Sequence, residues 1–439
     1  MDQNNQYYDM DSYRSGQAPK SRGNEGAAFV GGMVVGALVA LLLAGVVVSL
    51  VWLVNNNKKG SQQSVAREET EGVTSEDGRD GFVTDRMISK INSLVQTIQN
   101  EFFFEVPSDE ELEAGLYRGL MDSLGDRYTV YYTPEELEEL MTESQGVYFG
   151  IGAYISEGQE GSLAKISGVF KKGPAMEAGL RAEDLIYKVD GRETYGETLS
   201  DIVSWIKGPE GTKVVLTIVR NGEQMDVEVT RRKVEAPTVE SEMLGNGMGY
   251  LRLTEFDDVT VGQYKEAMSD LYAEGMKGLI LDLRSNPGGN LDTVVQIAQE
   301  MLPEGIVVYT EDKAGKRQNY RCKGDKEIQI PMVVLVDMNS ASAAEILAGA
   351  IQDYGKGTLV GTTTFGKGIV QSVLPARDGS AIKITVSGYF TPKGRNIHKI
   401  GIEPDVVCEF DGSLYYDVEN PIDNQLEKAK EVLAELMNK

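Results

Sequence analysis

The chain has 439 residues, of which 41% are apolar and 25% charged, a balance that excludes fibrous, collagen-like and wholly disordered proteins. Lys and Arg number 43 against 68 Asp and Glu, giving a net charge of −25, and no stretch gathers the basic residues. Nucleic acid is therefore not an expected partner. The two cysteines, Cys322 and Cys408, form no C-x-x-C pair, which excludes a disulfide scaffold and a cysteine-built zinc site. Whether they pair with each other stays open.

A single histidine, His398, limits the catalytic chemistry. An H-E-x-x-H metal site is excluded, and any Ser-His-Asp triad would have to use this residue. His398 lies in a stretch rich in glycine and charge, residues 392–399, which is typical of a surface loop. We therefore expect no histidine in the catalytic machinery.

Residues 27–54 contain no charged side chain. At ~1.5 Å per residue this run reaches ~42 Å as a helix, enough to cross a hydrocarbon core of ~30 Å with tilt. The apolar part of a signal peptide is only about 7–15 residues long and ends at an A-x-A-like site, which is absent here. We therefore expect an uncleaved transmembrane helix at 27–54, a cytoplasmic tail at 1–26 and a flexible linker at 55–80. Three basic residues precede the span and two lysines follow it closely, so the positive-inside rule favours a cytoplasmic N-terminus by a narrow margin.

Residues 81–145 show helical spacing. Apolar residues recur at intervals of three and four over residues 87–98 and again over 112–120. The sequence P-E-E-L-E-E-L at residues 134–140 places proline and acids where a helix begins. We therefore predict a small helical region in this part of the chain.

Residues 146–233 change to short apolar runs broken by glycines, which predicts strands with one or two short helices. Their order, with A-G-L at 178–180 and D-L-I at 184–186, resembles a PDZ domain, and an ordinary small β domain is the alternative. In PDZ domains the loop equivalent to residues 148–152 presents backbone N–H groups to the terminal carboxylate of a peptide that adds a strand to the sheet. The resemblance therefore implies a carboxylate site made by Phe149, Gly150, Ile151 and Gly152.

From residue 234 to 420 strands and helices alternate, which predicts an α/β core with a parallel sheet. The predicted strands cover residues 279–283, 331–337 and 358–360, and the predicted helices cover residues 291–302 and 343–354. A β-rich stretch follows at 370–391. The final segment, residues 421–439, contains an amphipathic helix predicted over 421–436.

Two turns between a predicted strand and a predicted helix, residues 284–290 and 339–345, lie at the carboxyl ends of strands, where α/β proteins place ligands. The second turn puts serine hydroxyls at a helix N-terminus, where free N–H groups and the helix dipole stabilise negative charge. Serines at helix starts are most often caps, so this turn alone does not indicate catalysis.

A third turn, G-T-T-T-F-G-K-G-I-V-Q at residues 361–371, nearly matches a nucleotide-binding P-loop. Gly368 stands where that loop needs a hydroxyl for Mg²⁺, and strand formers follow in place of a helix. The acidic strand also precedes the loop instead of following it. A P-loop ATPase is therefore the weaker interpretation.

Lys367 in this turn suits the role of a general base. In an extended segment Lys367, Ile369 and Gln371 point to one face, which would let Gln371 orient the amine. Lysine becomes a base only if its pKa falls from ~10.4 toward neutrality, by ~3 units or ~4 kcal/mol of desolvation or like-charge repulsion. Without a usable histidine, serine plus lysine is the remaining route to an activated hydroxyl.

Several motifs together resemble those of the carboxyl-terminal processing proteases, also called tail-specific proteases. The sequence S-A-S-A-A-E at residues 340–345 matches their S-A-S-A-S-E run, and F-G-K-G-I-V-Q at 365–371 matches their F-G-K-G-x-V-Q. The sequence L-D-L-R-S-N-P-G-G at 281–289 matches their L-D-L-R-x-N-P-G-G, and D-R-Y-T-V-Y at 126–131 is a version of their D-P-Y-S-x-Y. Two further family motifs fit at residues 391–397 and 401–405.

This resemblance implies the roles of the site residues. The family's nucleophile corresponds to Ser342 and its base to Lys367, which is held by the motif glutamine, Gln371. Glu345 matches a family residue with a supporting role near the site. The last serine of the family's run is Ala344 here, a departure that leaves the dyad intact and changes the local hydrogen bonding.

The resemblance also implies an oxyanion hole built from the backbone N–H groups of Ala343 and Gly288. This placement agrees with the helix-terminus argument, because both turns end strands of one sheet. The family requires no metal, nucleotide or organic cofactor.

The function implied by the resemblance is that of a membrane-anchored serine endopeptidase whose PDZ domain captures the free C-terminal tail of protein substrates. Its core is expected to resemble that of crotonase and Clp protease. The catalytic part is expected outside the cytoplasm, on a single-pass anchor in the cell membrane, and assembly into a homo-oligomer is left open. The alternative is a non-catalytic tail-binding adaptor, which would lack one member of the Ser-Lys dyad, whereas both are present here.

Overall fold

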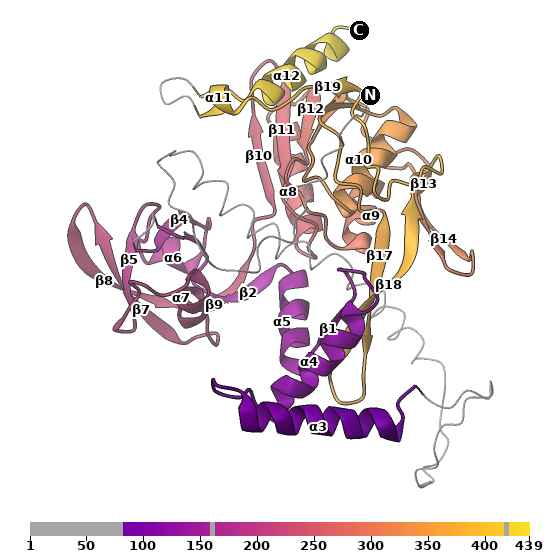
Figure 1. The fold of residues 1–439 in the computed structure, drawn as a ribbon. Coiled ribbons are helices and arrows are strands. Elements are labelled where there is room, and N and C mark those ends of the chain that lie inside the picture. Colours follow the sequence, from indigo (N-terminus) through magenta and orange to yellow (C-terminus); the bar gives the residue numbers. More distant parts are fainter. Residues whose placement is uncertain (1–81, 159–162, 417–420) are drawn as a thin grey trace, which may run out of the picture.

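A six-stranded sheet lies at the centre of the largest domain in the computed structural model, which describes residues 82–158, 163–416 and 421–439. Its strands follow the order β10-β11-β12-β15-β16-β19, and every neighbouring pair is parallel except β10 and β11. The strands are β10 (Val239–Met243), β11 (Met248–Leu253), β12 (Gly278–Asp282), β15 (Met332–Val336), β16 (Thr358–Gly361) and β19 (Val406–Val407). We call this the core domain (Figure 1).

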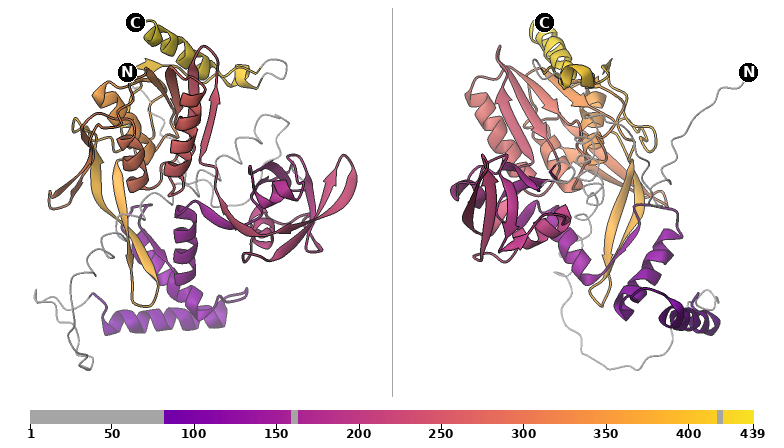
Figure 2. Two further views of the ribbon diagram at one scale, coloured as in Figure 1. Left: turned by 180° about the vertical axis from the view of Figure 1, so that it is seen from behind. Right: turned by 60° about the vertical axis from the view of Figure 1, so that its left-hand side comes forward.

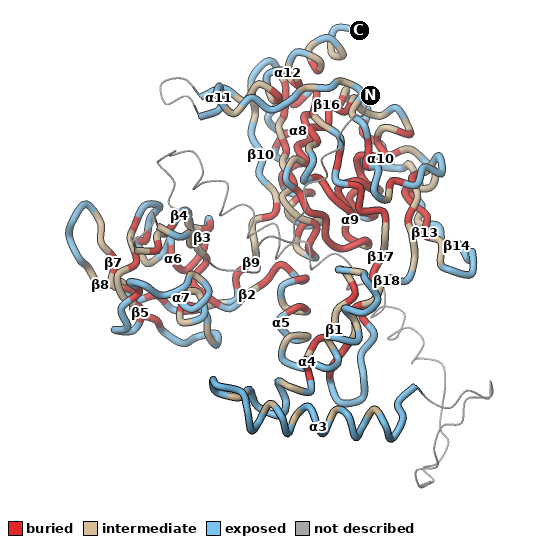
Figure 3. Tube along the Cα trace, viewed as in Figure 1, coloured by how far each residue is buried: buried red, intermediate tan, exposed pale blue. Residues whose placement is uncertain are grey.

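Helices cover both faces of the core sheet, which explains why its central strands are apolar on both sides. All residues of β12 and β15 are buried. Leu279 and Leu281 pack with the helices of one face, whereas Ile280 packs with the helix of the other. The first face carries α8 (Thr260–Ala273), α9 (Leu291–Gln299) and α10 (Ala343–Tyr354), and the second face carries α12 (Asn424–Met437). A short helix, α11 (Gly412–Tyr415), precedes α12. The buried residues concentrate in these layers (Figure 3).

A second sheet connects the core domain to the N-terminal helices. It has the order β1-β18-β13-β14, with β17 also paired to β18. Its strands are β1 (Val130–Tyr132), β13 (Gly305–Asp312), β14 (Arg317–Cys322), β17 (Ile369–Pro375) and β18 (Ala381–Phe390). The β17–β18 hairpin extends from the core toward the N-terminal helices (Figure 1), where β1 pairs antiparallel with β18 and places Val130 opposite Lys383.

Three helices precede and follow β1: α3 (Asp85–Glu101), α4 (Asp109–Asp122) and α5 (Pro134–Ser144). The helical spacing predicted for this region is thus confirmed. Ser108 and Glu111 form a capping box at the start of α4, and Thr133 and Glu136 form another at α5. Helix α3 has no buried residue and lies at the opposite end of the molecule from α12 in both views of Figure 2.

The PDZ-like domain runs from β2 to β9 and lies beside the core domain (Figure 2). Its main sheet has the order β3-β4-β5-β7-β8, with β6 paired to β5, and β2 pairs with β9 where the chain enters and leaves the domain. Among the described residues, β3 therefore has a strand partner on one side only. The elements are β2 (Val147–Gly150), β3 (Ala153–Ser156), β4 (Lys165–Val169), α6 (Pro174–Glu177), β5 (Leu185–Val189), β6 (Arg192–Glu193), α7 (Leu199–Ile206), β7 (Lys213–Arg220), β8 (Glu223–Thr230) and β9 (Arg232–Glu235).

Some predicted boundaries differ from those of the structure. The C-terminal helix begins at Asn424, later than predicted, because the Asp423 side chain accepts a hydrogen bond from the Leu426 N–H (3.0 Å) and caps it. The predicted helix at 291–302 ends at Gln299. The region at 81–145 also contains β1, whose partner strand is more than 200 residues away in the sequence and could not be recognised locally.

No helix in the described part of the chain is long and apolar enough to span a bilayer. The predicted membrane span at 27–54, with the tail at 1–26 and the linker at 55–80, lies outside the described residues.

We predict that the packing of α12 on the core sheet contributes strongly to stability. Leu433 is fully buried against this sheet, so Leu433→Ala should lower the free energy of unfolding by about 2–5 kcal/mol. Glu435 is exposed on the same helix, and Glu435→Ala should change it by no more than about 0.5 kcal/mol. Urea titration followed by circular dichroism measures both, and equal effects of the two substitutions would contradict the packing described here.

Candidate functional site

The predicted site residues lie beyond the carboxyl ends of three adjacent strands of the core sheet. Gly288 follows β12, Ser342 follows β15 and begins α10, and Lys367 follows β16. Because β12, β15 and β16 are parallel neighbours, their following loops emerge at one edge of the sheet. The topology therefore gathers three motifs that are separated in the sequence.

Ser342 stands on a strained turn against the glycine loop. Its φ of 53° lies in the left-handed region, which costs a residue with a side chain about 1–3 kcal/mol. A Cβ atom on Gly288 would lie 2.8 Å from Ser342 Cβ and 3.0 Å from the Ala343 nitrogen, so only glycine fits opposite this turn. The Tyr389 hydroxyl donates to the Ser342 carbonyl oxygen (2.9 Å) and helps to hold the turn. Ser342 is 6% exposed.

The fully buried carboxylate of Glu345 joins the serine turn to the lysine loop. Its Oε2 accepts the backbone N–H groups of Ser342 and Lys367, both at 2.9 Å. Its Oε1 accepts the Gly366 N–H (2.8 Å) and the Thr364 hydroxyl (2.5 Å). Burial raises the pKa of Glu345, and these four donors act in the opposite direction by stabilising the charged form.

Lys367 is 1% exposed and has the electrostatics that a general base needs. Burial, followed by the positive charges of Lys383 and Arg127, lowers the pKa of Lys367 to about 7. Glu345 and Asp126 act in the opposite direction. The Lys367 amine lies 4.6 Å from the centre of an aromatic ring, that of Tyr128 in the N-terminal region.

Gln371 belongs to a partly buried polar chain that links β17 and β18 to the segment before β1. It lies on β17 opposite Thr385 of β18, and its Nε2 donates to Thr385 Oγ1 (3.2 Å). Thr385 Oγ1 in turn donates to Asp126 Oδ2 (2.6 Å). Burial alone would raise the pKa of Asp126, but hydrogen bonds from Thr385, Thr129 and the Tyr128 backbone hold it below its usual value.

The two predicted oxyanion donors differ in whether their N–H groups already have a hydrogen-bond acceptor. The Ala343 N–H, next to Ser342, donates to none of the described residues. The Gly288 N–H instead donates to Asn286 Oδ1 (2.8 Å), and Asn286 is itself buried and tied through Nδ2 to the Leu253 carbonyl oxygen (2.8 Å). The Gly288 N–H thus already has a buried acceptor in this structure, and its part in an oxyanion hole stays a prediction.

In the PDZ-like domain the predicted carboxylate loop leads into edge strand β3. The carbonyl oxygens of Phe149, Ile151 and Gly152 accept hydrogen bonds within the domain. The N–H groups of Ile151 and Gly152, by contrast, donate to no residue within 82–158, 163–416 or 421–439. Gly150 ends β2, opposite Arg232 of β9.

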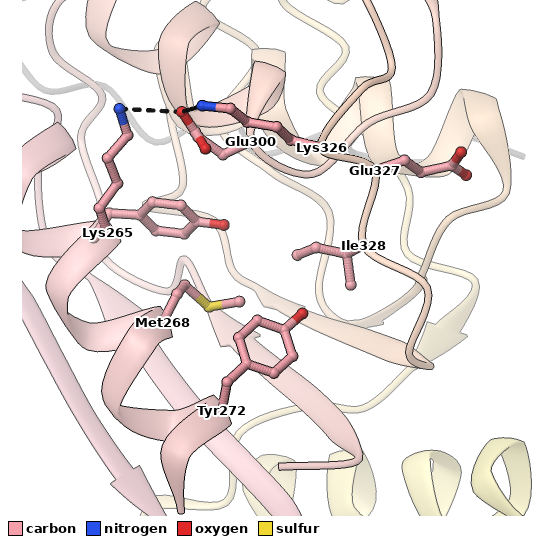
Figure 4. A pocket seen from close by; sticks show the side chains of 8 residues that line it. Lys265, Met268, Tyr272, Glu300, Lys326, Glu327 and Ile328 are labelled. Atoms are coloured by element: carbon pink, nitrogen blue, oxygen red, sulfur yellow. Dashed lines mark hydrogen bonds and ion pairs between the residues drawn. The ribbon is translucent and has the colours of Figure 1, made fainter. Parts of the chain in front are cut away.

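In the described ranges, no group of three or more His, Cys, Asp or Glu side chains is arranged to hold a metal ion. The stretch that resembles a P-loop continues into strand β17, as the sequence predicts. Cys322 and Cys408 are free and do not pair. A pocket of about 260 Å³ lies between α8 and residues 326–328, where Glu300 pairs with Lys265 and Lys326 (Figure 4); none of the predicted site residues lines it.

Sequence reasoning missed several residues around the lysine: Asp126, Tyr128, Lys383, Thr385 and Tyr389. The motif at 126–131 was recognised, but its position beside Lys367 depends on the pairing of β1 with β18, which no local pattern indicates. Lys383 is 2% exposed, and burial lowers its pKa to about 8. The backbone of His398 packs against Gly368, where an added Cβ would lie 2.6 Å from the His398 nitrogen.

Comparisons with known proteins find matches for both the core domain and the PDZ-like domain. Residues 247–408 match Peptidase family S41, and residues 165–220 match the PDZ domain family. The chain is 36% identical over 320 residues to the carboxyl-terminal-processing protease of Synechocystis sp., covering 72% of this chain and 75% of that protein. It is 34% identical over 327 residues to the carboxy-terminal processing protease CtpA of Bacillus subtilis, covering 74% and 70%. Among solved structures, the photosystem II D1 C-terminal processing protease is 31% identical, with 75% of this chain and 89% of that chain covered and a TM-score of 0.45.

We predict that Lys383 tunes Lys367 through its charge. Removing this charge in Lys383→Met should raise the pKa of Lys367, so the pH below which Ser342 loses reactivity should move upward from about 7, by ~0.5–1 unit. The measurement is the rate of Ser342 labelling by a fluorophosphonate between pH 5 and pH 9. Lys188→Met makes the same charge change in the PDZ-like domain and should leave the pH profile unmoved. An unmoved profile in Lys383→Met would contradict the prediction.

Proposed function

Because the chain belongs to the carboxyl-terminal processing proteases, a family of serine-type peptidases with a PDZ domain, we propose that Ser342 and Lys367 cleave peptide bonds as a dyad. The observation that carries this proposal is the shared carboxylate of Glu345. It receives the backbone N–H groups of Ser342 and Lys367 at the same oxygen and so holds nucleophile and base in one place.

In the proposed reaction, Ser342 Oγ attacks the scissile carbonyl carbon while its proton passes to the neutral amine of Lys367. The resulting ammonium then donates this proton to the leaving amine, and water hydrolyses the acyl-enzyme by the reverse route. A pKa of Lys367 near 7 suits both steps, because the amine is neutral in about half of the molecules at that pH and its ammonium remains acidic. Gln371, buried on β17, is proposed to orient this amine.

The oxyanion that forms during attack is proposed to bind first to the Ala343 N–H, which begins α10 and benefits from the helix dipole. Gly288 provides the space that brings the loop after β12 against the serine turn. Its N–H becomes a second donor only when it releases Asn286 Oδ1.

The PDZ domain is proposed to bind the free C-terminal tail of a protein substrate. The unpartnered edge of β3 among the described strands supports addition of the tail as an extra strand. The N–H groups of Ile151 and Gly152, which donate to no described residue, suit a terminal carboxylate. Phe149 and Gly150 belong to the same proposed site through the family resemblance.

We further propose that residues 27–54 anchor the chain in the cell membrane as a single span, with the catalytic part outside the cytoplasm. The support is the uncharged apolar run itself, which is long enough to cross a bilayer. The likeness of the core to crotonase and Clp protease also stays a prediction from the family.

The proposed function is tested with the full chain in detergent micelles and an unfolded protein substrate, reduced and carboxymethylated α-lactalbumin extended by a free apolar C-terminal tail. Mass spectrometry maps the cuts. The unmodified chain should cleave this substrate, whereas Ser342→Ala and Lys367→Ala should each lower the rate by at least about 1,000-fold. Amidation of the tail should slow cleavage by the unmodified chain, because the carboxylate no longer binds.

Two outcomes would contradict the proposal. Cleavage that persists in Lys367→Ala would exclude the dyad. Binding of the tail without cleavage by the unmodified chain would instead favour the tail-binding adaptor. Lys399→Ala, which removes an exposed lysine from a neighbouring loop, is the matched control and should cleave at the unmodified rate.

A further inference from the structure

The segment between α4 and α5 reaches the lysine site through the second sheet. Because β1 pairs with β18, the residues just before β1 lie beside Thr385, whose backbone N–H donates to Thr129 Oγ1 (3.3 Å). The N-terminal region is therefore in direct contact with the strand hairpin that carries Gln371 and Lys383.

Within this segment, the ring of Tyr128 contacts two cations. The Lys367 amine nitrogen lies 4.6 Å from the ring centre and the Arg127 guanidinium carbon 4.9 Å from it. Arg127 also donates from Nη2 to the Tyr128 hydroxyl (2.7 Å). The face of an aromatic ring attracts a cation, most strongly where water is excluded, and Lys367 is 1% exposed.

Asp126 holds Tyr128 in this position and connects it to Gln371. Its Oδ1 accepts the Tyr128 N–H (3.0 Å), and its Oδ2 accepts the hydroxyls of Thr129 (2.7 Å) and Thr385 (2.6 Å). Thr385 Oγ1 is in turn the acceptor of Gln371 Nε2 (3.2 Å). One carboxylate thus fixes both the backbone that carries the ring and the side chain next to the glutamine.

We propose that Tyr128 is a positioning residue for the lysine base and that Asp126 sets its place, so that the N-terminal helical region completes the active site. This inference deepens the proposed function and rests on Lys367 being the base. It assigns to Asp126 and Tyr128 a role in the chemistry of a lysine more than 200 residues away in the sequence.

The chemistry explains why a ring suits this position. When Ser342 attacks, its O–H bond breaks and an N–H bond forms on Lys367, which creates an ammonium in a buried site. That N–H bond breaks when the proton moves to the leaving amine. A ring face stabilises the transient ammonium and excludes water, whereas a carboxylate in its place would keep the lysine protonated at rest and remove the base.

The charges that face Lys367 come from several elements, and the ring acts among them. The N-terminal segment contributes one acidic and one basic side chain, and α10 contributes a carboxylate. Strand β18 contributes a second buried lysine. The single histidine, in the loop after β18, interacts with the acidic side chain of the N-terminal segment. These groups are Asp126, Arg127, Glu345, Lys383 and His398.

The test uses the full chain in detergent micelles and an internally quenched peptide built on the mapped cut, with kcat and KM measured from pH 5 to pH 9. Tyr128→Phe keeps the ring and should retain at least about half of kcat. Tyr128→Leu fills much of the same space without a π face, so kcat should fall about tenfold at unchanged KM. Its acid limb should also move to lower pH by about 0.5–1 unit, because the ammonium loses a favourable contact.

Tyr131→Leu is the matched control, since Tyr131 belongs to β1 and packs on the ring of Tyr117 (5.0 Å between ring centres). It should leave the pH profile unmoved. If Tyr128→Leu does not fold, Tyr128→Met replaces it, because the flexible thioether side chain fits irregular space. Equal profiles for the Phe and the Leu or Met variants would overturn the inference, and so would an equal shift in Tyr131→Leu.

The outcome separates this inference from the proposed function. Activity that survives Lys367→Ala would remove the dyad and the inference with it. Loss of activity in Lys367→Ala together with an unshifted profile in Tyr128→Leu would leave the dyad in place and show that Tyr128 does not position it.

Discussion

The structure of the site depends on one buried carboxylate. Glu345 is fully buried and accepts four hydrogen bonds, two of them from the backbone N–H groups of Ser342 and Lys367. A buried carboxylate without such donors would be very costly, so the turn and the loop must stay where they can supply them. The backbone positions of the proposed nucleophile and base are thereby set by one carboxylate. The left-handed φ of Ser342 is a strain that this network maintains.

Three parts of the chain supply what this carboxylate holds together. The parallel core sheet brings the loops after β12, β15 and β16 to one edge. The second sheet contributes Gln371 and Lys383, and through β1 it recruits the N-terminal segment that covers the lysine. Burial, followed by the charges of Lys383 and Arg127, lowers the pKa of Lys367 to about 7, which would not happen in an isolated loop exposed to water. The low pKa of Lys367 therefore depends on the assembled fold, although the motif that contains this lysine is short.

The candidate site residues Ser342 and Lys367 could be located from the sequence, whereas the groups that surround them could not. The apolar runs of β12 and β15 and the spacing of α10 follow from local patterns, and the motifs around Ser342 and Lys367 are recognisable in the printed chain. The requirement that the pKa of a lysine base must fall could be stated beforehand, but not the groups that lower it. Tyr128 reaches Lys367 because β1 pairs with β18, a strand more than 200 residues away in the sequence. Lys383 reaches it because β18 pairs with β17 in a hairpin that contains a register shift. The bond from the Gly288 N–H to Asn286 was equally hidden, because a G-G pair does not reveal which acceptor its amide meets.

The measurement that tests this account most directly is the rate at which a fluorophosphonate labels Ser342 in Glu345→Gln, compared with the melting temperature of the same variant. A glutamine amide has a single acceptor oxygen, and its NH₂ group would face the two donors that now meet either Oε1 or Oε2. The serine turn and the lysine loop should then separate, and labelling should fall by about 100-fold, since small displacements of reacting groups have effects of that size. Glu300→Gln, which changes a carboxylate that pairs with Lys265 and Lys326 away from the site, should label at the unmodified rate. Labelling of Glu345→Gln within about threefold of the unmodified chain, in a folded protein, would contradict the central role of this carboxylate.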